Sequence, residues 1–400
     1  MGIIAERISF IKPSPTLAIS SKAKELKAMG RDIISLSVGE PDFTVPDYIK
    51  DAAKKAIDNN DSRYTLTPGT VEVRKAIKDK LLRENGLEYS VDEITVNCGG
   101  KHSIFNVFMA TIDKDDEVII PAPYWVSYPD VVKLFEGKCV MVDCHAKDNF
   151  KLSPKDLENA ITDKTKWLIL NSPSNPTGAA YTKSELKALA EVLLKHPHVW
   201  VMTDDIYEHI VYDDFEFANI IQTEPKLKSR GVIINGMSKA FAMPGWRIGY
   251  AAGPLDLIKA VNKLQSQSTS HAASICQTAS AVGLNGDMSF LQERNKAFKE
   301  RRDFIVAELN KAKGVQCLTP EGAFYVYPLI EGLIGKKTKE GKVINNDSDF
   351  AEFLLEEKGV AIVPGVAFGL SPYVRLSYAC SLDVLKEASK RILEFCESLS

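Results

Sequence analysis

Short runs of β-branched residues alternate with amphipathic helical stretches from about residue 60 to about residue 270, and this alternation constrains the fold more than any other feature of the sequence. The runs that we expect to form strands begin at Glu117, Cys139, Trp167, Val199, Gly231 and Ile248. Helical periodicity is clearest over residues 182–195, which begin with the capping-box pattern Thr182…Glu185. Strands that alternate with helices form a mostly parallel sheet covered on both faces, so the sequence predicts an α/β protein.

The pattern changes after about residue 290. A long charged helix is expected over about residues 290–312, followed by strands around Phe324 and Val374 and a last helix from about Leu382. We therefore predict a large domain over residues 46–290. The smaller α+β domain would be built from both ends of the chain, residues 1–45 and 291–400.

Charge and cysteine content exclude several classes of protein. The 400 residues carry 50 Lys and Arg against 53 Asp and Glu, a balance that indicates neither nucleic-acid nor membrane-surface binding. No apolar run approaches the roughly 20 residues of a membrane-spanning helix, and the N-terminus lacks the pattern of a secretory signal. Seven cysteines without a CxxC pair indicate free thiols in a reducing compartment. We expect a cytoplasmic protein.

A lysine in a loop after an apolar strand is the strongest chemical signal. Lys239 lies among apolar residues in Asn-Gly-Met-Ser-Lys-Ala-Phe-Ala-Met-Pro-Gly-Trp-Arg, eight residues before Arg247. Apolar surroundings disfavour an ammonium ion, and a neutral amine is a nucleophile towards an aldehyde. Ser238 and Arg247 are suitable ligands for a phosphate dianion. The alternative is a solvated surface lysine, as most lysines at strand ends are.

Two polar segments follow other expected strands, at the sheet edge where open α/β sheets bind ligands. Asp204 follows the strand from Val199, and a buried acid there requires a cation such as a protonated pyridine nitrogen. Tyr207, three residues later, could reach the same ligand. Asn175 lies in Asn-Ser-Pro-Ser-Asn-Pro-Thr-Gly, and its amide could bond a phenolic oxygen of a bound ring. The alternatives are a helix N-cap for Asp204 and an ordinary turn around Asn175.

Two further loops could contact the same ligand. The pair Gly99 and Gly100 opens an amphipathic helix, whose first N–H groups would form an anion site, although a plain turn explains the glycines equally well. Trp125 lies in the aromatic loop Pro-Ala-Pro-Tyr-Trp-Val-Ser-Tyr-Pro. It is either part of the core or a stacking surface for a planar cofactor.

In order and spacing, these motifs resemble the class I aminotransferases of fold type I, which use pyridoxal 5′-phosphate (PLP). The resemblance rests on NPTG, on Asp with Tyr three residues later, and on Lys with Arg eight residues later, and Lys239 follows Asp204 by 35 residues. It covers nearly the whole chain, from Ile11 to Arg375-Leu-Ser-Tyr. The chain looks most like the prokaryotic aspartate aminotransferases, some of which also transaminate prephenate. The resemblance implies transamination of L-aspartate with 2-oxoglutarate, giving oxaloacetate and L-glutamate.

The resemblance also implies a role for each cofactor-binding residue. Lys239 would form a Schiff base with PLP and carry the Cα proton, and Asp204 would keep the pyridine nitrogen protonated. Tyr207 and Asn175 would bond the phenolic oxygen, and Trp125 would stack on the ring. The phosphate would be bound by Gly99, Gly100, Lys101, Ser238 and Arg247.

Substrate and subunit contacts follow from the same resemblance. Arg375, with Asn175, would bind the substrate α-carboxylate, and Gly39 would contact it through its backbone. Tyr64 would reach the phosphate of the neighbouring subunit, which implies a homodimer with shared active sites. Lys12 and Lys101 are the candidates for the distal carboxylate of aspartate. No metal is expected.

Three positions depart from the family pattern. Pro244 replaces the usual Thr, His102 a frequent Gln, and Asp205 a common Glu, but none removes a catalytic atom. The alternatives within the fold are a prephenate or bifunctional aminotransferase and a PLP-dependent carbon–sulfur lyase. A DNA-binding regulator is disfavoured because only about 30 residues precede the first core strand, and a nicotinamide dehydrogenase because no G-x-G-x-x-G occurs.

Overall fold

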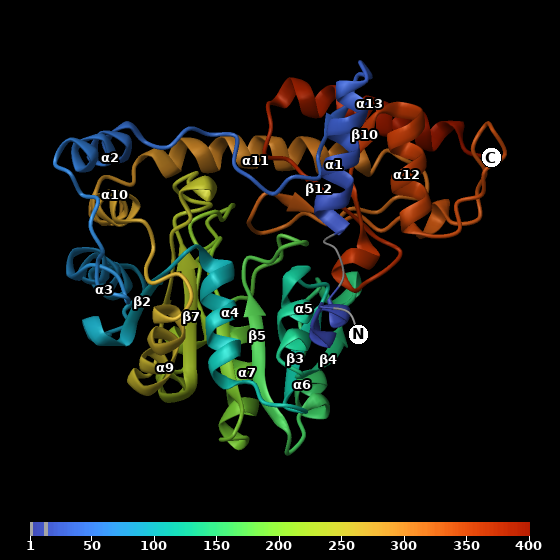
Figure 1. Ribbon diagram of the computed structural model, residues 1–400. Helices are drawn as coiled ribbons and strands as arrows, with labels where there is room; N and C mark the ends of the chain where they lie inside the picture. Colours follow the sequence, from blue (N-terminus) through green and yellow to red (C-terminus); the bar gives the residue numbers. More distant parts are fainter. Residues whose placement is uncertain (1–2, 12–14) are drawn as a thin grey trace.

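The computed structural model describes residues 3–11 and 15–400, and within them a seven-stranded sheet forms the centre of the molecule (Figure 1). Its order is β2-β8-β7-β6-β5-β3-β4. The strands are β2 (Ile94–Asn97), β3 (Glu117–Ala122), β4 (Lys138–Asp143), β5 (Thr165–Asn171), β6 (Trp200–Asp204), β7 (Gly231–Gly236) and β8 (Gly249–Ala252). Only the pairings of β8, with β2 and β7, are antiparallel. The predicted mostly parallel α/β sheet is confirmed.

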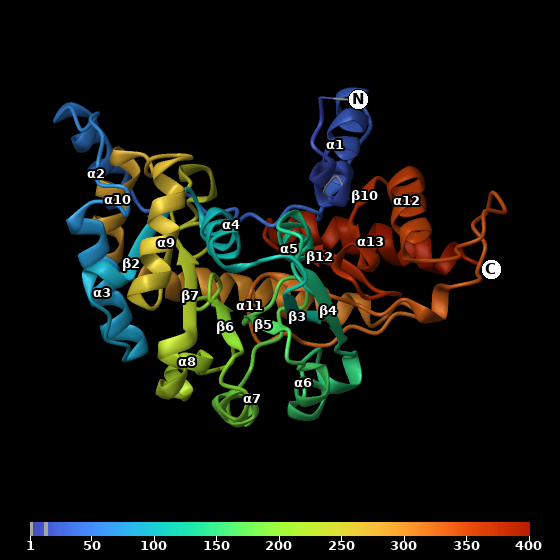
Figure 2. The same cartoon turned by 60° about the horizontal axis from the view of Figure 1, so that its bottom comes forward.

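Helices cover both faces of this sheet. Alternate strand residues point to opposite faces, so Val118 and Ile120 pack in one apolar cluster and Ile119 in another. Figure 2 shows α4 (Gly100–Thr111), α5 (Ser127–Leu134) and α9 (Leu255–Ser266) on one side of the sheet and the others on the opposite side. Those others are α6 (Pro154–Ala160), α7 (Lys183–Lys195) and the short α8 (Ile220–Thr223). The capping box predicted at Thr182 and Glu185 begins α7.

Three more helices lie beside the β2 edge of the large sheet. They are α2 (Asp47–Asp58), α3 (Val71–Asn85) and α10 (Ser274–Asn285), and α10 packs against the other two. Helix α3 ends at Gly86, whose φ of 64° is the left-handed conformation that glycine adopts without strain.

Residues 15–45 and 291–400 lie above the carboxyl ends of the parallel strands, whereas residues 6–10 contact α5 (Figure 1). Strand β1 (Ile34–Ser35) pairs in parallel with β10 (Val360–Ala361), and β11 (Val363–Pro364), β12 (Val374–Ser377) and β9 (Tyr325–Val326) form a three-stranded antiparallel sheet. The helices of this region are α1 (Pro15–Ala28), α11 (Phe290–Leu309), α12 (Asp347–Lys358) and α13 (Leu382–Ser398). The small domain over residues 1–45 with 291–400 stays a prediction. We call residues 15–45 with 291–400 the terminal region below.

All seven cysteines of the sequence lie within the described residues, and each is a free thiol. Among the helices of residues 3–11 and 15–400, none is both long enough and apolar enough to cross a membrane.

Candidate active site

A cavity of about 380 Å³ lies where the carboxyl ends of β5, β6 and β7 face the terminal region. This volume suits a small-molecule ligand. The predicted site residues that line it are Gly39, Gly100, Lys101, Trp125, Asn175, Asp204, Tyr207, Ser238, Lys239, Arg247 and Arg375. Gly99 adjoins it as the residue before α4. Segments far apart in the chain therefore converge on one site.

Lys239 lies in this cavity, three residues beyond β7. Its Nζ donates a hydrogen bond of 2.6 Å to the carbonyl oxygen of Gly39 and lies 5.8 Å from the centres of the Tyr207 and Phe324 rings. Desolvation is the main cause that lowers the pKa of Lys239 to about 8. The alternative of a solvated surface lysine is therefore wrong, and the neutral form of this amine is favoured relative to that of an ordinary lysine.

Asp204 is the last residue of β6, and its carboxylate is buried in the cavity wall. Oδ2 accepts a hydrogen bond of 2.6 Å from the Tyr128 hydroxyl, and Oδ1 accepts one of 3.4 Å from the N–H of Ile206. Burial raises the pKa of Asp204 to about 6. Since residues 206–209 form a turn rather than a helix, the helix N-cap alternative is wrong. A buried carboxylate facing a cavity favours a cationic ligand group there.

Arg375 is a buried cation that has no acidic partner among the described residues. Nη1 donates to Asn175 Oδ1 at 3.0 Å and Nη2 to the carbonyl oxygen of Ser37 at 2.5 Å, but Nε is buried without a partner. The guanidinium lies 4.7 Å from the centre of the Tyr325 ring. A buried guanidinium with an unused donor fits an anionic ligand, above all a carboxylate that can accept two parallel bonds.

The start of α4 forms a second cationic end of the cavity. Gly99 precedes the helix with a φ of 92°, and no side chain caps the free N–H groups that follow it. The Arg247 guanidinium lies directly over Gly99, where a Cβ atom would overlap it, and Nη2 donates to the carbonyl oxygen of Cys98 at 3.2 Å. Backbone donors and a guanidinium at one place suit a phosphate dianion.

Tyr64 lies apart from this cavity. It is 91% exposed, and its ring makes an edge-to-face contact with that of His271, with 5.7 Å between centres. Lys12 lies outside the described residues. Lys101 lines the cavity, and its Nζ lies 5.0 Å from the centre of the Trp125 ring.

Two tyrosines in the cavity wall were not predicted from the sequence. Tyr128 contacts Asp204, as described, and the Tyr325 hydroxyl lies 2.9 Å from that of Tyr207. The signal for Tyr128 was present, since it lies three residues after Trp125 in the same aromatic loop. No local pattern marks Tyr325, because its place depends on how the terminal region packs over the sheet.

The three departures from the family pattern are all accommodated. His102 Nδ1 accepts the N–H of Cys98 at 3.2 Å, and burial lowers the pKa of this histidine. Asp205 is buried, accepts hydrogen bonds from Thr203 and Asn219, and has a pKa that burial raises to about 7. Pro244 begins a short 3₁₀ turn, residues 244–246.

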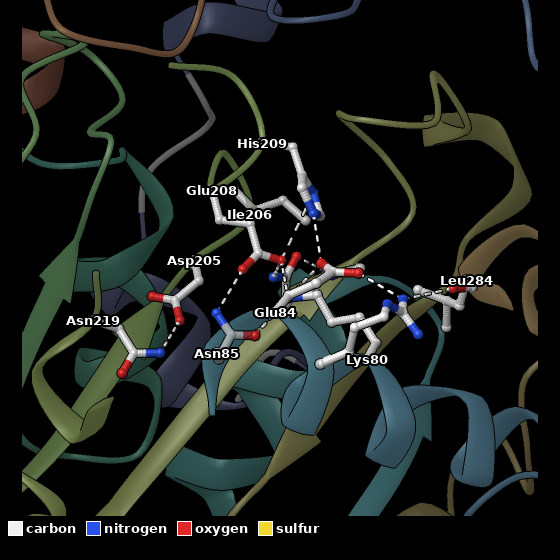
Figure 3. A network of polar contacts seen from close by, with 12 residues as sticks. Lys80, Glu84, Asn85, Asp205, Ile206, Glu208, His209, Asn219 and Leu284 are labelled. Carbon is white, nitrogen blue, oxygen red and sulfur yellow. Dashed lines mark hydrogen bonds and ion pairs between the residues drawn. The ribbon is translucent and has the colours of Figure 1, made fainter. Parts of the chain in front are cut away.

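A buried polar network lies behind the segment that carries Asp204 and Tyr207 (Figure 3). The Glu208 carboxylate accepts hydrogen bonds from Lys80 and Asn85 of α3, and from Asn235 of β7 at 2.7 Å. Glu208, Glu84 and His209 offer side-chain atoms within 4.8 Å of one another, as in a metal site. Lys80 pairs with both carboxylates and Arg83 pairs with Glu84, so two cations face the two carboxylates.

Comparisons with known proteins agree with this geometry. The family profile described as aminotransferase class I and II matches residues 31–392. The chain is 56% identical over 396 residues, 99% of each protein, to one from Rhizobium leguminosarum bv. phaseoli named probable aspartate/prephenate aminotransferase. It is 54% identical, over the full length of both, to the aspartate/prephenate aminotransferase of Cereibacter sphaeroides.

Two solved structures share the fold along the whole chain. The aspartate aminotransferase of Rhizobium meliloti has a TM-score of 0.98 at 52% identity, with 100% of both chains covered. The aspartate aminotransferase of Thermus thermophilus with maleate has a TM-score of 0.92 at 38% identity, covering 99% of this chain and 100% of the other.

Proposed function

Because the chain belongs to the class I and II aminotransferases, we propose that it transfers the amino group of L-aspartate to 2-oxoglutarate, giving oxaloacetate and L-glutamate, with PLP as cofactor. The observation that carries the proposal is one cavity that joins three buried or partly buried groups. These are the amine of Lys239 with its lowered pKa, the carboxylate of Asp204, and the guanidinium of Arg375, which has no acidic partner in the part of the chain that the structure describes.

The residues of the cavity fit PLP at each of its ends. The backbone at Gly99, Gly100 and Lys101, with Ser238 and Arg247, would bind the phosphate. Asp204 would bind the protonated pyridine nitrogen, and Trp125 would stack on the ring. When bound, PLP links to an amino group and accepts the electron pair that remains when the substrate Cα loses its proton.

The chain's own residues would bind the substrate and move its proton. Arg375 would bind the α-carboxylate through paired N–H donors, with Asn175 fixing the plane of the guanidinium. This would orient the Cα–H bond towards Lys239, whose neutral Nζ would accept the proton and return it as a general acid. Tyr207 and Asn175 would bond the phenolic oxygen of the cofactor.

The distal carboxylate of aspartate would require one more cation. Lys101 lies in the cavity wall over Trp125 and is our candidate, together with Lys12. With Arg375 on the α-carboxylate and Lys101 on the distal carboxylate, the site would favour dicarboxylic amino acids over those with apolar side chains.

Prephenate is a second candidate amino acceptor, alone or beside the two oxo acids of the aspartate reaction, 2-oxoglutarate and, in the reverse direction, oxaloacetate. The relatives from Rhizobium leguminosarum and Cereibacter sphaeroides carry both substrates in their names. The apolar side chains of Val38, Ile104 and Val126 in the cavity lining support binding of a bulkier dicarboxylate.

Steady-state kinetics would test these assignments. We expect comparable values of kcat/KM with oxaloacetate and prephenate as acceptors if the enzyme is bifunctional, and turnover of aspartate in either case. Activity with prephenate but none with aspartate would contradict the primary assignment. Release of pyruvate and ammonia from cystathionine without an oxo acid would indicate the carbon–sulfur lyase instead.

We also propose a cytoplasmic homodimer with shared active sites. Tyr64 is 91% exposed, and the apolar Leu66 (58%) and Val71 (50%) beside it are exposed as well, as expected of a surface that a second copy covers. Sedimentation would measure the mass. If Tyr64 reaches the partner's phosphate, Tyr64→Phe should weaken PLP binding without changing the folded monomer.

A further inference from the structure

Tyr128 makes the shortest contact to Asp204 in the cavity wall. The two side chains are both buried, and the Tyr128 hydroxyl lies 2.6 Å from Oδ2 of Asp204. An ionised carboxylate can only accept hydrogen bonds, so the hydroxyl is the donor when Asp204 is charged. The contact from the N–H of Ile206 to Oδ1 is longer, at 3.4 Å. Tyr128 is therefore the principal donor that this carboxylate meets inside the protein.

Packing fixes the Tyr128 ring in this position. Tyr128 is the second residue of α5, and its ring lies edge-on to that of Trp125, with 5.3 Å between centres. It also belongs to the apolar cluster that joins α4, α5 and α9 to the sheet. The hydroxyl cannot turn away without displacing these neighbours, so it fixes the orientation of the Asp204 carboxylate.

We propose that Tyr128 is a positioning residue for Asp204, holding its carboxylate ionised and in one orientation towards the cavity. The inference rests on the proposed function in one respect: the cation that Asp204 would meet is the pyridinium of PLP. A hydroxyl donor stabilises the charged form of a buried acid and opposes its desolvation. Without Tyr128, more of Asp204 would be protonated near neutral pH and unable to bind that cation.

Two other titratable groups also face Asp204. They are Lys239 after β7 and Tyr207 after β6. The carboxyl group of Asp205 bonds Thr203 and Asn219 instead. Lys239 favours the ionised form of Asp204, but its charge changes as it accepts and returns a proton. The donor from Tyr128 remains the same throughout, and this distinguishes its contribution from that of the lysine.

Carboxyl ¹³C NMR of the cofactor-free protein tests the inference without any catalysis. The Asp204 signal is assigned by its loss in Asp204→Asn and is followed between pH 4 and 9. In Tyr128→Phe, which keeps the ring, we expect the midpoint to rise by about one pH unit, the effect of losing one hydrogen bond to a charged group. Tyr124→Phe, which removes a hydroxyl from the same loop, should leave the midpoint unchanged. An unchanged midpoint in Tyr128→Phe would overturn the inference.

A measurement on the unsubstituted protein keeps the test independent of how that variant folds. The ζ carbon of Tyr128, in tyrosine-labelled protein, should shift with pH at the same midpoint as Asp204. A flat Tyr128 signal would show that the two groups are not coupled. In the PLP-loaded enzyme, the acid limb of kcat should move to higher pH in Tyr128→Phe while KM for aspartate changes less than about twofold. Lack of transamination by the wild type would refute the proposed function alone, because the NMR titration does not depend on turnover.

Discussion

The amino group of Lys239 donates a hydrogen bond of 2.6 Å to the carbonyl oxygen of Gly39, which lies 200 residues earlier in the chain. Gly39 follows β1, which pairs with β10 of the terminal region, whereas Lys239 follows β7 of the large sheet. The position requires glycine, because a Cβ atom there would overlap the Tyr325 hydroxyl. The nucleophile therefore contacts both parts of the molecule, and any movement of the terminal region over the sheet changes its surroundings.

Replacing Lys239 should abolish the covalent bond to PLP without abolishing the binding of PLP. Lys239→Ala removes the amine but leaves the phosphate and ring contacts, so we expect PLP to bind without a covalent bond. Transamination should fall by about a thousandfold or more, because the proton carrier at Cα is lost as well. After borohydride reduction and denaturation, mass spectrometry should find PLP attached to the wild type only. Covalent PLP in the variant would contradict the assignment of Lys239.

Asp204→Asn should slow the loss of the Cα proton while PLP remains bound. The amide has nearly the same shape as the carboxylate but cannot balance a protonated ring nitrogen, so we expect exchange of the substrate Cα proton in deuterated water to slow by about a hundredfold or more. PLP content would be measured in the same samples. Exchange at the wild-type rate would mean that Asp204 serves only the local turn.

How far the site could be predicted depended on whether its parts are local in the chain. Asp204 and Lys239 follow buried strands, and neighbouring parallel strands present their carboxyl ends together, so a shared site was a physical expectation. The contact of Tyr128 with Asp204 could not be expected in the same way, because it depends on the strand order β6-β5-β3, which no local pattern encodes. The bond between Arg375 and Asn175 likewise joins two separately packed regions.

The fold was predicted in its class but not in all its details. The alternating pattern indicated the parallel strands, because each is a buried β-branched run bounded by turn residues. The strand at Gly249–Ala252 could not be distinguished as antiparallel, since direction depends on the connection and not on the residues. Strand β2 was missed because four residues between a turn and a glycine pair carry too weak a pattern.

Arg375→Lys should weaken substrate binding, although it preserves the charge. A lysine offers one point donor in place of the planar pair, and it would lose the bond to Asn175 that orients the guanidinium. We expect kcat/KM for aspartate to fall by about 10- to 100-fold, mainly through KM. PLP content and the covalent link to Lys239 should not change. An unchanged KM would contradict the assigned carboxylate site.

Breaking the network behind the site should affect stability more than an exposed ion pair does. Lys80→Met would leave the buried Glu208 carboxylate without its cation, so we expect the free energy of unfolding to fall by about 3–5 kcal/mol. The control is Lys54→Met, which removes the partner of Asp51 at the surface and should leave the free energy of unfolding nearly unchanged. Urea denaturation of both variants would measure the difference. Equal effects would show that the network has no special role in stability.

The reactivity of Lys239 should reveal its lowered pKa directly. In the cofactor-free protein, burial lowers this pKa to about 8, whereas Lys54, beside Asp51, has its pKa raised above the ordinary lysine value. Only the neutral amine is acylated, so the fraction of reactive Lys239 should increase as pH rises through about 8, well before that of Lys54.

Competitive labelling with a trace of acetic anhydride, read by peptide mass spectrometry between pH 6 and 11, would measure the midpoints of both lysines in one sample. Adding inorganic phosphate should move the Lys239 midpoint upwards, because an anion at Arg247 offsets a cation that disfavours the ammonium form. Identical midpoints for the two lysines would mean that water enters the cavity freely, and that the nucleophile needs another explanation for its activation.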